Sequence, residues 1–438
     1  MTKCTTETIQ FPVCKRRQVE VDFAGGEITS DGGVLLLREI DRRLGLTLAV
    51  ADCLPDYRNP KYIKHSLLSQ LRQRVYALCH GYEDLNDHQT LRADPAIQTA
   101  VERDTILSSP PTLCRFENNM GREAAVEIHK VIIEQFIASF TKAPEQLILD
   151  FDATDDRVHG QQEGRFFHGY YDHYCFLPLY VFCGDQLLVG YLRPSKIDGA
   201  KHAWAILSLL VKRIRRTWPE VKIIFRGDSG FCRWKMLSWC DRNNVGYIVG
   251  IAKNARLNSM AADLIIKAEQ DYQTSKTKQR IFTEFYYAAA SWEKPRRILA
   301  KAEHSGRGSN PRYVATNLPG DAQDLYDNLY CARGEMENRI KEQQLGLFAD
   351  RTSCHNWWPN QFRLLLSGLA YILLERLRTL ALSATTLARS QAGTIRLKLL
   401  KIGAAIVRNT RRVRLMLSSS YPYRDIFRKV AGYLLEPG

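Results

Sequence analysis

The sequence predicts an α/β protein in which a mixed sheet of five strands carries packed helices and is flanked by mainly helical terminal regions. Short β-rich runs begin at residue 147 and alternate with amphipathic helical patterns up to residue 251. Before and after this stretch, apolar residues recur mostly at helical spacing. A chain of 438 residues with 45% hydrophobic residues has room for two or three folded domains, or for a single large domain with an insertion, and excludes a mainly disordered protein.

The first 140 residues are predicted to be mainly helical. Polar residues from Ser30 to Gly33 precede the apolar run Val34–Leu37, which predicts a capped helix over residues 29–42. A second helix is predicted by apolar residues at three- and four-residue spacing, which are Leu67, Leu68, Leu71, Val75 and Leu78.

The central elements follow the order βββαβαβ. Strands are predicted at 147–152, 178–182, 187–192, 221–226 and 245–251, and helices at 201–218 and 231–242. Cys183 to Gln186 has the composition of a hairpin turn, so the second and third strands should be antiparallel neighbours. Right-handed βαβ crossovers then complete a mixed five-strand sheet. This is the order of elements in the ribonuclease H-like fold.

The second half of the chain is predicted to contain an insertion and two helical segments. A helix over 256–271 and strands over 280–288, 297–303 and 312–316 suggest a β-rich insertion. Asp321 is expected to cap the helix that follows it, and the chain should then be helical nearly to its end. We therefore expect an N-terminal region (1–140), the first part of the core (141–255), the insertion (256–320), a core helix (321–350) and a basic helical C-terminal region (351–438).

The charge balance indicates a polyanionic partner. The chain has 62 Lys and Arg residues against 47 Asp and Glu residues, a net charge of +15, and nucleic acid is the commonest partner of such a chain. The alternative is a basic enzyme without a polyanionic partner. Most of the excess positive charge lies beyond residue 360, where the chain has fourteen basic residues and three acids. Four of these basic residues are close enough in sequence to form one phosphate-binding patch, or else a solvated helix face, and they are Arg408, Arg411, Arg412 and Arg414.

Three other classes of protein or site are disfavoured. No run of 18 apolar residues predicts a membrane span, and the N-terminus lacks the apolar core of a secretory signal, so a cytoplasmic protein is expected. The eleven cysteines show no C-x2-C pair and are expected to be reduced. His159, His168 and His173 form the densest histidine cluster, but no cysteine stands at zinc-ligand spacing beside them.

Two aspartates lie at strand ends, where the functional residues of α/β sheets are usually found. Asp152 closes the first predicted strand and Asp228 follows the fourth, and in this strand order the two strand ends should converge. Each aspartate alone is more typical of a turn or cap residue, whereas the two together in this strand order favour a functional site. Asp150 points to the same side of its strand as Asp152, so it is an alternative first acid.

A third acid is predicted on a helix. At about 100° per residue, five polar side chains fall within an arc of about 80° on one face, which are Tyr330, Arg333, Glu337, Lys341 and Gln344. Glu335 and Glu342 should point away. The alternative is a solvated face on which Arg333 and Glu337 form an i,i+4 ion pair.

Three carboxylates at one place suit Mg²⁺, which prefers oxygen ligands. Two such ions, about 3.5–4 Å apart, activate a water or hydroxyl nucleophile and stabilise the leaving oxygen of a phosphodiester. The sequence thus predicts a phosphoryl-transfer site with Asp152, Asp228 and Glu337 as catalytic metal ligands and two Mg²⁺ ions, for which Mn²⁺ should substitute.

The motifs around these acids resemble the DDE transposases of bacterial insertion sequences. They are Asp-x-Thr at Asp152, Arg-x-Asp at Asp228, and Tyr-x2-Arg-x3-Glu ending at Glu337. The segments 149–160 and 81–87 are similar to the branch called DDE group 1 transposases, and the resemblance runs from about residue 25 to 430. It implies a β-rich insertion between the second and third acids, and it implies that Tyr330 and Arg333 hold the DNA strand at the metals. The related signature has a Lys seven residues after the Glu, where this chain has Gln344; Lys341 lies on the same face and is the candidate substitute for that phosphate contact.

The resemblance implies a transposase that binds the terminal inverted repeats of its element, cleaves them and joins the 3′-hydroxyl ends to target DNA. Its expected partners are double-stranded DNA and a second copy of the chain in a homodimeric synaptic complex associated with the bacterial nucleoid. Two alternatives stay open: a non-catalytic DNA-binding protein derived from a transposase, and a metal-dependent nuclease without strand transfer.

Overall fold

The computed structural model describes residues 8–436, which divide into two compact units. The first unit comprises the chain up to Asn119 and from Leu369 onward, and the second runs from Met120 to Gly368. The three predicted catalytic acids all belong to the second unit. In the described part of the chain, no helix has both the length and the apolar content that a membrane span requires.

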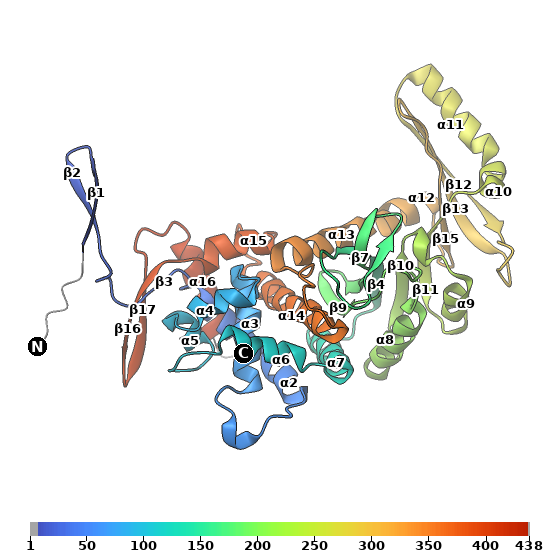
Figure 1. Cartoon of the computed structure of the whole chain (residues 1–438). Helices are drawn as coiled ribbons and strands as arrows, with labels where there is room; N and C mark the ends of the chain where they lie inside the picture. The colour runs from blue at the N-terminus through green and yellow to red at the C-terminus, as the bar shows by residue number, and fades with distance from the viewer. Residues whose placement is uncertain (1–7, 437–438) are drawn as a thin grey trace, which may run out of the picture. The chain divides into compact units, whose positions relative to one another are not determined.

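The second unit contains a large mixed sheet with helices (Figure 1). Its strands are β4 (Gln146–Ala153), β5 (Asp156–Arg157), β6 (Phe166–His168), β7 (His173–Phe176), β8 (Leu179–Cys183), β9 (Gln186–Tyr191), β10 (Lys222–Gly227), β11 (Gly246–Ile251), β12 (Gln279–Tyr287), β13 (Arg296–Ser305), β14 (Gly308–Ser309) and β15 (Arg312–Thr316). Its helices and helical turns are α7 (Arg122–Ala138), α8 (Ala203–Thr217), η3 (Ser229–Phe231), α9 (Trp234–Arg242), α10 (Ala255–Met260), α11 (Ala262–Ser275), α12 (Ala322–Asp324), η4 (Leu325–Tyr330), η5 (Cys331–Arg333), α13 (Gly334–Lys341) and η6 (Glu342–Gly346). Helix α14 (Trp357–Arg376) continues along the chain into the first unit.

The strand order of the large sheet is β12-β13-β15-β11-β10-β4-β8-β9, with β14 paired to β13. Strands β4, β10 and β11 are parallel neighbours, and β8 is antiparallel to both β4 and β9. The predicted hairpin of the second and third core strands is confirmed, as is the predicted contact between the strands that precede Asp152 and Asp228. Between β4 and β8, strands β5, β6 and β7 form a separate small sheet that the sequence pattern did not indicate.

Both faces of the central strands are buried, which explains their near-continuous apolar runs. On one face, Phe151, Phe225 and Val249 join a core with side chains from α7, α8 and α9. On the other, Ile224 and Ile248 pack against the segment from Ala322 to Tyr326. Because successive strand residues alternate between faces, Asp150 and Asp152 lie on the face opposite Phe151. This face is the one covered by the 322–330 segment, which leads directly into the helix that carries the third acid.

The segment predicted as a β-rich insertion begins with helices α10 and α11 and continues with strands β12 to β15. These strands add to the edge of the sheet beyond β11, so they extend the sheet of the core. The expected cap at Asp321 is confirmed, since its carboxylate accepts a hydrogen bond from the Asp324 amide at 2.9 Å.

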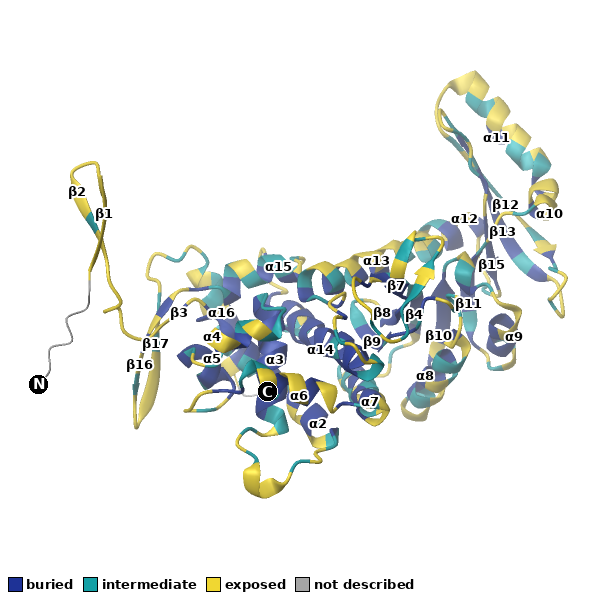
Figure 2. Ribbon diagram, viewed as in Figure 1, coloured by how far each residue is buried: buried dark blue, intermediate teal, exposed yellow. Residues whose placement is uncertain are grey.

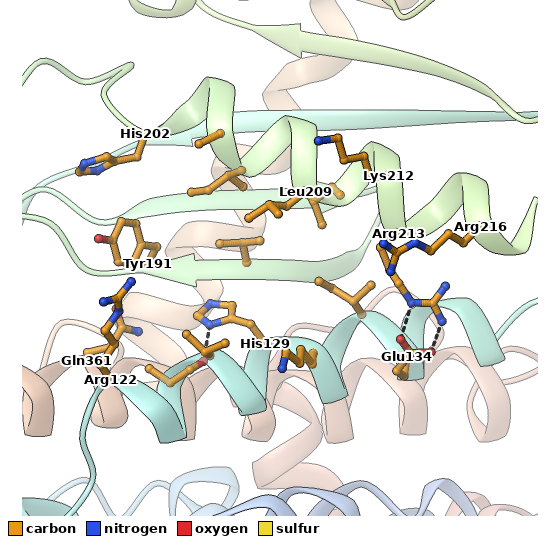
Figure 3. A pocket seen from close by; sticks show the side chains of 18 of the residues that line it. Arg122, His129, Glu134, Tyr191, His202, Leu209, Lys212, Arg213, Arg216 and Gln361 are labelled. Carbon is orange, nitrogen blue, oxygen red and sulfur yellow. Dashed lines mark hydrogen bonds and ion pairs between the residues drawn. The ribbon is translucent and has the colours of Figure 1, made fainter. Parts of the chain in front are cut away.

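The opposite edge of the sheet, strand β9, is covered by side chains. The Gly190 amide donates to His129 Nε2 at 3.3 Å, and Gln361 bonds the Leu192 amide and the Gly190 carbonyl. Covering an edge in this way prevents pairing with another strand. Beside it, α7, α8 and β9 line a groove of about 830 Å³, with Arg122, Lys212 and Arg216 at its rim (Figure 3). None of the predicted site residues lines this groove.

The first unit is mainly helical, as predicted for its N-terminal part. Its helices and helical turns are α1 (Val34–Leu44), α2 (Leu46–Cys53), η1 (Pro60–Tyr62), α3 (Leu67–His80), η2 (Leu85–Asp87), α4 (His88–Leu91), α5 (Pro95–Ala100), α6 (Pro110–Asn118), η7 (Leu377–Ala381), α15 (Ala392–Ile395), η8 (Arg396–Leu400) and α16 (Arg424–Leu435). Its strands are β1 (Ile9–Cys14), β2 (Arg17–Val21), β3 (Ile28–Thr29), β16 (Ala404–Asn409) and β17 (Arg412–Leu417). The side chain of Asp31 does not cap α1 but is buried, where it accepts a hydrogen bond from the Tyr82 hydroxyl and pairs with Lys401.

The prediction of a wholly helical C-terminal region is wrong for residues 404–417. These residues form the antiparallel hairpin β16–β17, and β16 also pairs with β3. The physical reason is a period of two: Ala404 and Ile406 are buried, whereas Ala405 and Val407 are exposed. The basic residues predicted to line a helix face therefore lie on a β-ribbon.

Candidate active site

Asp152 and Asp228 stand side by side at the ends of two parallel strands. Asp152 is the next-to-last residue of β4, and Asp228 directly follows Gly227, the last residue of β10. Gly227 pairs with Phe151 in the strand register, so the residue after each of them is one of the two aspartates. Asp228 also caps the short turn η3, because its Oδ1 accepts a hydrogen bond from the Gly230 amide at 2.8 Å. Asp228 is therefore both a cap residue and a neighbour of Asp152.

Arg333 contacts both Glu337 and Asp152, and so links the third acid to the first. The segment from Leu325 to Gly346 is a succession of π, 3-10 and α turns instead of one regular helix. Arg333 Nη1 lies 3.4 Å from Asp152 Oδ2, and Arg333 Nη2 donates to Glu337 Oε1 at 3.0 Å. The i,i+4 ion pair considered as an alternative is therefore present, and the same guanidinium also contacts the first aspartate. Glu335 is 73% exposed, as predicted for a residue that points away.

The electrostatics of Asp152 reflect both burial and the neighbouring charges. The pKa of Asp152 is raised to about 7, mainly by burial; Arg333 opposes the shift, and the negative charges of Asp228 and Glu337 add to it. Carboxylates that repel one another in a buried place favour a proton or a cation between them. In this structure Arg333 supplies that positive charge. As the side chains stand, no three His, Cys, Asp or Glu residues within 8–436 are arranged to hold a metal ion.

Tyr330 packs against the backbone at the end of β11. A Cβ atom at Gly250 would lie 2.5 Å from the Tyr330 hydroxyl oxygen and 3.0 Å from the Ser229 amide nitrogen. Only glycine therefore allows this approach. Burial raises the pKa of Tyr330, and the nearby Asp228 adds to the shift while Arg333 opposes it. The tyrosine thus lies in the same cluster of charges as Arg333.

A buried ion pair connects the three elements that carry the acids. Arg226 Nη2 donates to Asp150 Oδ2 at 2.7 Å, and Arg226 Nε contacts the other oxygen of the same carboxylate. Arg226 Nη1 donates to the Leu329 carbonyl at 2.6 Å. Strand β4, strand β10 and the segment before Tyr330 are therefore held together by one guanidinium, which we call the Arg226 brace. Because both oxygens of Asp150 are bound to Arg226, the geometry favours Asp152 over Asp150 as the first acid.

The other predicted DNA-binding residues are dispersed. Lys341 is exposed at the end of α13, and Gln344 donates to the Asp155 carbonyl at 2.9 Å. Arg411, Arg412 and Arg414 are exposed at the tip and on the second strand of the β16–β17 hairpin. Arg408 is held by Glu27 and by Gln98, so it is less available to an external phosphate than the other three.

Comparison with known families agrees with this arrangement. Residues 11–436 match the family described as transposase DDE domain group 1. The chain belongs to this family. No match was found among curated protein sequences. Among solved structures, a cryo-EM structure titled piggyBac transposase synaptic complex with hairpin DNA matches with 8% sequence identity and a TM-score of 0.42, covering 85% of this chain and 79% of that chain.

Two residues of this transposase-family site were missed by the sequence interpretation. Arg226 was read only as part of a motif, and Gly250 was not considered. A signal for Arg226 was present, since Asp150 and Arg226 each stand two residues before an acid on adjacent parallel strands and are directly paired. Gly250 carries no such signal, because its contact with Tyr330 depends on segments eighty residues apart.

Proposed function

We propose that this chain is an active DDE transposase that binds the terminal inverted repeats of its own insertion sequence, cleaves the DNA by metal-assisted hydrolysis and joins the 3′-hydroxyl ends to target DNA. The observation that carries the proposal is the convergence of Asp152, Asp228 and Glu337 around one guanidinium. Family membership supports it independently.

The sheet supports the proposed architecture. Strands β9, β8, β4, β10 and β11 follow one another in the order and directions of a ribonuclease H-like core, with Asp152 near the end of β4 and Asp228 directly after β10. In our proposal residues 141–255 form the first part of this core and residues 321–350 supply its third acid. The N-terminal and C-terminal segments of the first unit form the DNA-binding part.

The donor set fits two Mg²⁺ ions. All three candidate ligands are carboxylates, and burial together with the negative charges of Asp228 and Glu337 raises the pKa of Asp152, so a cation bound among them would be stabilised. Asp152, Asp228 and Glu337 would hold the ions, with Mn²⁺ as a substitute; bound there, the ions would supply Lewis-acid stabilisation of the charge that develops on the phosphodiester. Arg333 must then leave its present contacts with two of these carboxylates, which frees its guanidinium to bind the phosphate itself. Tyr330 lies near Arg333 and would limit how far the DNA strand can move.

One experiment tests this function. The purified chain is incubated with a duplex that carries the element's terminal repeat and a target plasmid, with and without Mg²⁺, and the products are separated on a denaturing gel. Joined products support the transposase. Cleaved ends without joining would indicate a nuclease, binding without cleavage would indicate a non-catalytic DNA-binding protein, and both results contradict the proposal. Mass photometry of the DNA complex tests the proposed homodimer.

Substitution of Arg333 by lysine separates phosphate binding from orientation of the acids. Lysine keeps a one-point ion pair but loses the planar fork that binds a phosphate through two hydrogen bonds. We expect Arg333→Lys to lower the cleavage rate by about tenfold to a hundredfold, ~1.4–2.8 kcal/mol, with the Mg²⁺ concentration for half-maximal rate nearly unchanged. A parallel loss of apparent metal affinity would show that Arg333 only orients the acids. Arg339→Lys, six residues further along the chain and paired with Asp185, is the matched control.

Neutralising the exposed arginines of the β16–β17 hairpin tests the DNA-binding role of the first unit. We expect the combined variant Arg411→Gln, Arg412→Gln and Arg414→Gln to flatten the slope of log K against log salt by about 2.7, since each lost phosphate contact contributes about 0.9. Fluorescence anisotropy of a labelled duplex between 50 and 200 mM salt would measure the slope. The control neutralises Arg122, Lys212 and Arg216 at the rim of the second unit's groove. An equal change in both variants would indicate a general charge effect and contradict a specific patch.

A further inference from the structure

The chain begins, in its described part, with a two-stranded hairpin that is amphipathic. Strands β1 and β2 pair antiparallel, with Ile9 opposite Val21 and Phe11 opposite Val19, so these four side chains share one face. The other face is polar, because Gln10 bonds both Glu20 and Gln18 across the strands. The sequence interpretation described residues 1–140 as mainly helical and assigned no element to residues 9–21.

Within residues 8–436, the apolar face of this hairpin is largely exposed. Ile9 is 48% exposed and Phe11 is 49% exposed, and Figure 2 shows both strands almost entirely exposed. An isolated two-stranded hairpin is at best marginally stable in water. A regular alternation that leaves large apolar side chains in solvent therefore indicates a surface that another molecule covers.

Charge identifies the class of that molecule. The turn and its flank carry Lys15, Arg16 and Arg17, all exposed, whereas Glu20 is the one acid of the two strands. A β-ribbon with a cationic tip complements a phosphate backbone, and a two-stranded ribbon fits the major groove of B-DNA. Apolar side chains in that groove contact thymine methyl groups.

The connection to the second basic ribbon supports the same partner. Residues 22–27 link β2 to β3, and Ile28 of β3 pairs with Ala405 of β16. Six residues span at most about 20 Å, less than one turn of B-DNA, which is ~34 Å. The β1–β2 hairpin and the β16–β17 hairpin can therefore reach one duplex at the same time.

We propose that the β1–β2 hairpin is a DNA-binding ribbon that enters the major groove of the terminal-repeat DNA. Its tip contacts phosphates, and its apolar face contacts thymine methyl groups through Ile9, Phe11, Val19 and Val21. This inference rests on the proposed function, because it needs a duplex held by the first unit. It assigns to the chain a DNA contact that is independent of the acids and of the tail arginines.

Three variants and two duplexes test the inference through binding alone. The tip variant carries Lys15→Gln, Arg16→Gln and Arg17→Gln. The face variant carries Phe11→Thr and Val21→Thr, because threonine is also a good strand former. The control carries Gln10→Thr and Gln18→Thr on the polar face. Each is titrated by fluorescence anisotropy against the terminal-repeat duplex and against the same duplex with uracil in place of thymine, which removes the methyl groups. Circular dichroism checks that the helical content is unchanged.

We expect the tip variant to flatten the salt slope by about 2.7. We expect the face variant to bind about tenfold more weakly to the thymine duplex. Replacing thymine by uracil should weaken the unchanged chain and the control but leave the face variant unaffected. Equal binding by all variants to the thymine duplex would overturn the hairpin inference alone, and failure of the unchanged chain to bind either duplex would overturn the proposed function as well. A dimer that dissociates in the face variant without DNA would instead assign the apolar face to a second copy and overturn the inference.

Discussion

Replacing any one of the three acids by its amide should abolish DNA cleavage while leaving end binding largely intact. Asp152→Asn, Asp228→Asn and Glu337→Gln keep the shape of each side chain but remove a charged ligand of the proposed ions. Such ligands act on the transition state more than on the protein–DNA contact. We expect a loss of at least about a thousandfold in the cleavage rate, ~4 kcal/mol, measured with saturating protein on a labelled terminal-repeat duplex.

Glu335→Gln is the matched control for this prediction. It removes the same charge from the same helix, two residues before Glu337, but its side chain is 73% exposed and its carboxylate lies 3.9 Å from Arg339, away from the cluster. We expect its cleavage rate to stay within about threefold of the unchanged chain, since this is a surface substitution outside the site. Full cleavage by a folded Asp228→Asn or Glu337→Gln variant would refute the proposed site.

Breaking the Arg226 brace should destabilise the second unit more than any surface substitution. Arg226→Met leaves the buried carboxylate of Asp150 without its partner and removes a hydrogen bond to the Leu329 carbonyl. Removing one partner of a buried ion pair costs about 3–5 kcal/mol. For a unit of this size the expected fall in melting temperature is on the order of 10 °C, measured by differential scanning calorimetry.

Two further variants show whether the brace also positions the site. Asp198→Ala removes the ion pair between Asp198 and Arg233. Because each of these two side chains is 50% exposed, the variant should lose less than about 1 kcal/mol of folding stability. The double variant Asp150→Leu and Arg226→Met replaces the buried charges by apolar groups and should recover most of the stability. We expect its cleavage rate to stay low, because the contact between β10 and the segment before Tyr330 is still missing. Recovery of both stability and cleavage would reduce the brace to a structural role.

The sequence alone was sufficient for the core strands, because their signals are local. Strand β4 shows a buried apolar run that ends in acids, and β8 and β9 are separated by a short turn with Gly184. The parallel contact of β4 and β10 followed from the crossover rule for βαβ units. The sequence is therefore sufficient to place Asp152 and Asp228 together.

Where the local signals conflicted or were weak, the sequence interpretation was wrong or assigned no element. In residues 404–417 the density of arginines suggested a basic helix face, yet the period of two, with Ala404 and Ile406 buried, determines the fold of this segment. In residues 9–21 the same period is present, but it is weakened by Pro12 and by the irregular register between Phe11 and Cys14. Charge content does not distinguish a helix from a strand, whereas the spacing of apolar residues does.

By itself, the sequence determined the element order of the core, the two strand-end aspartates and the helical segment with Tyr330, Arg333 and Glu337. Only the tertiary structure decided which first aspartate is available, because Asp150 and Asp152 point to the same side of β4 and differ only in their partners. Arg226 is adjacent to Asp150 through strand pairing and reaches Leu329 across 103 residues. Contacts between segments so far apart depend on how the sheet and the following helix pack, and no local pattern of residues records that packing.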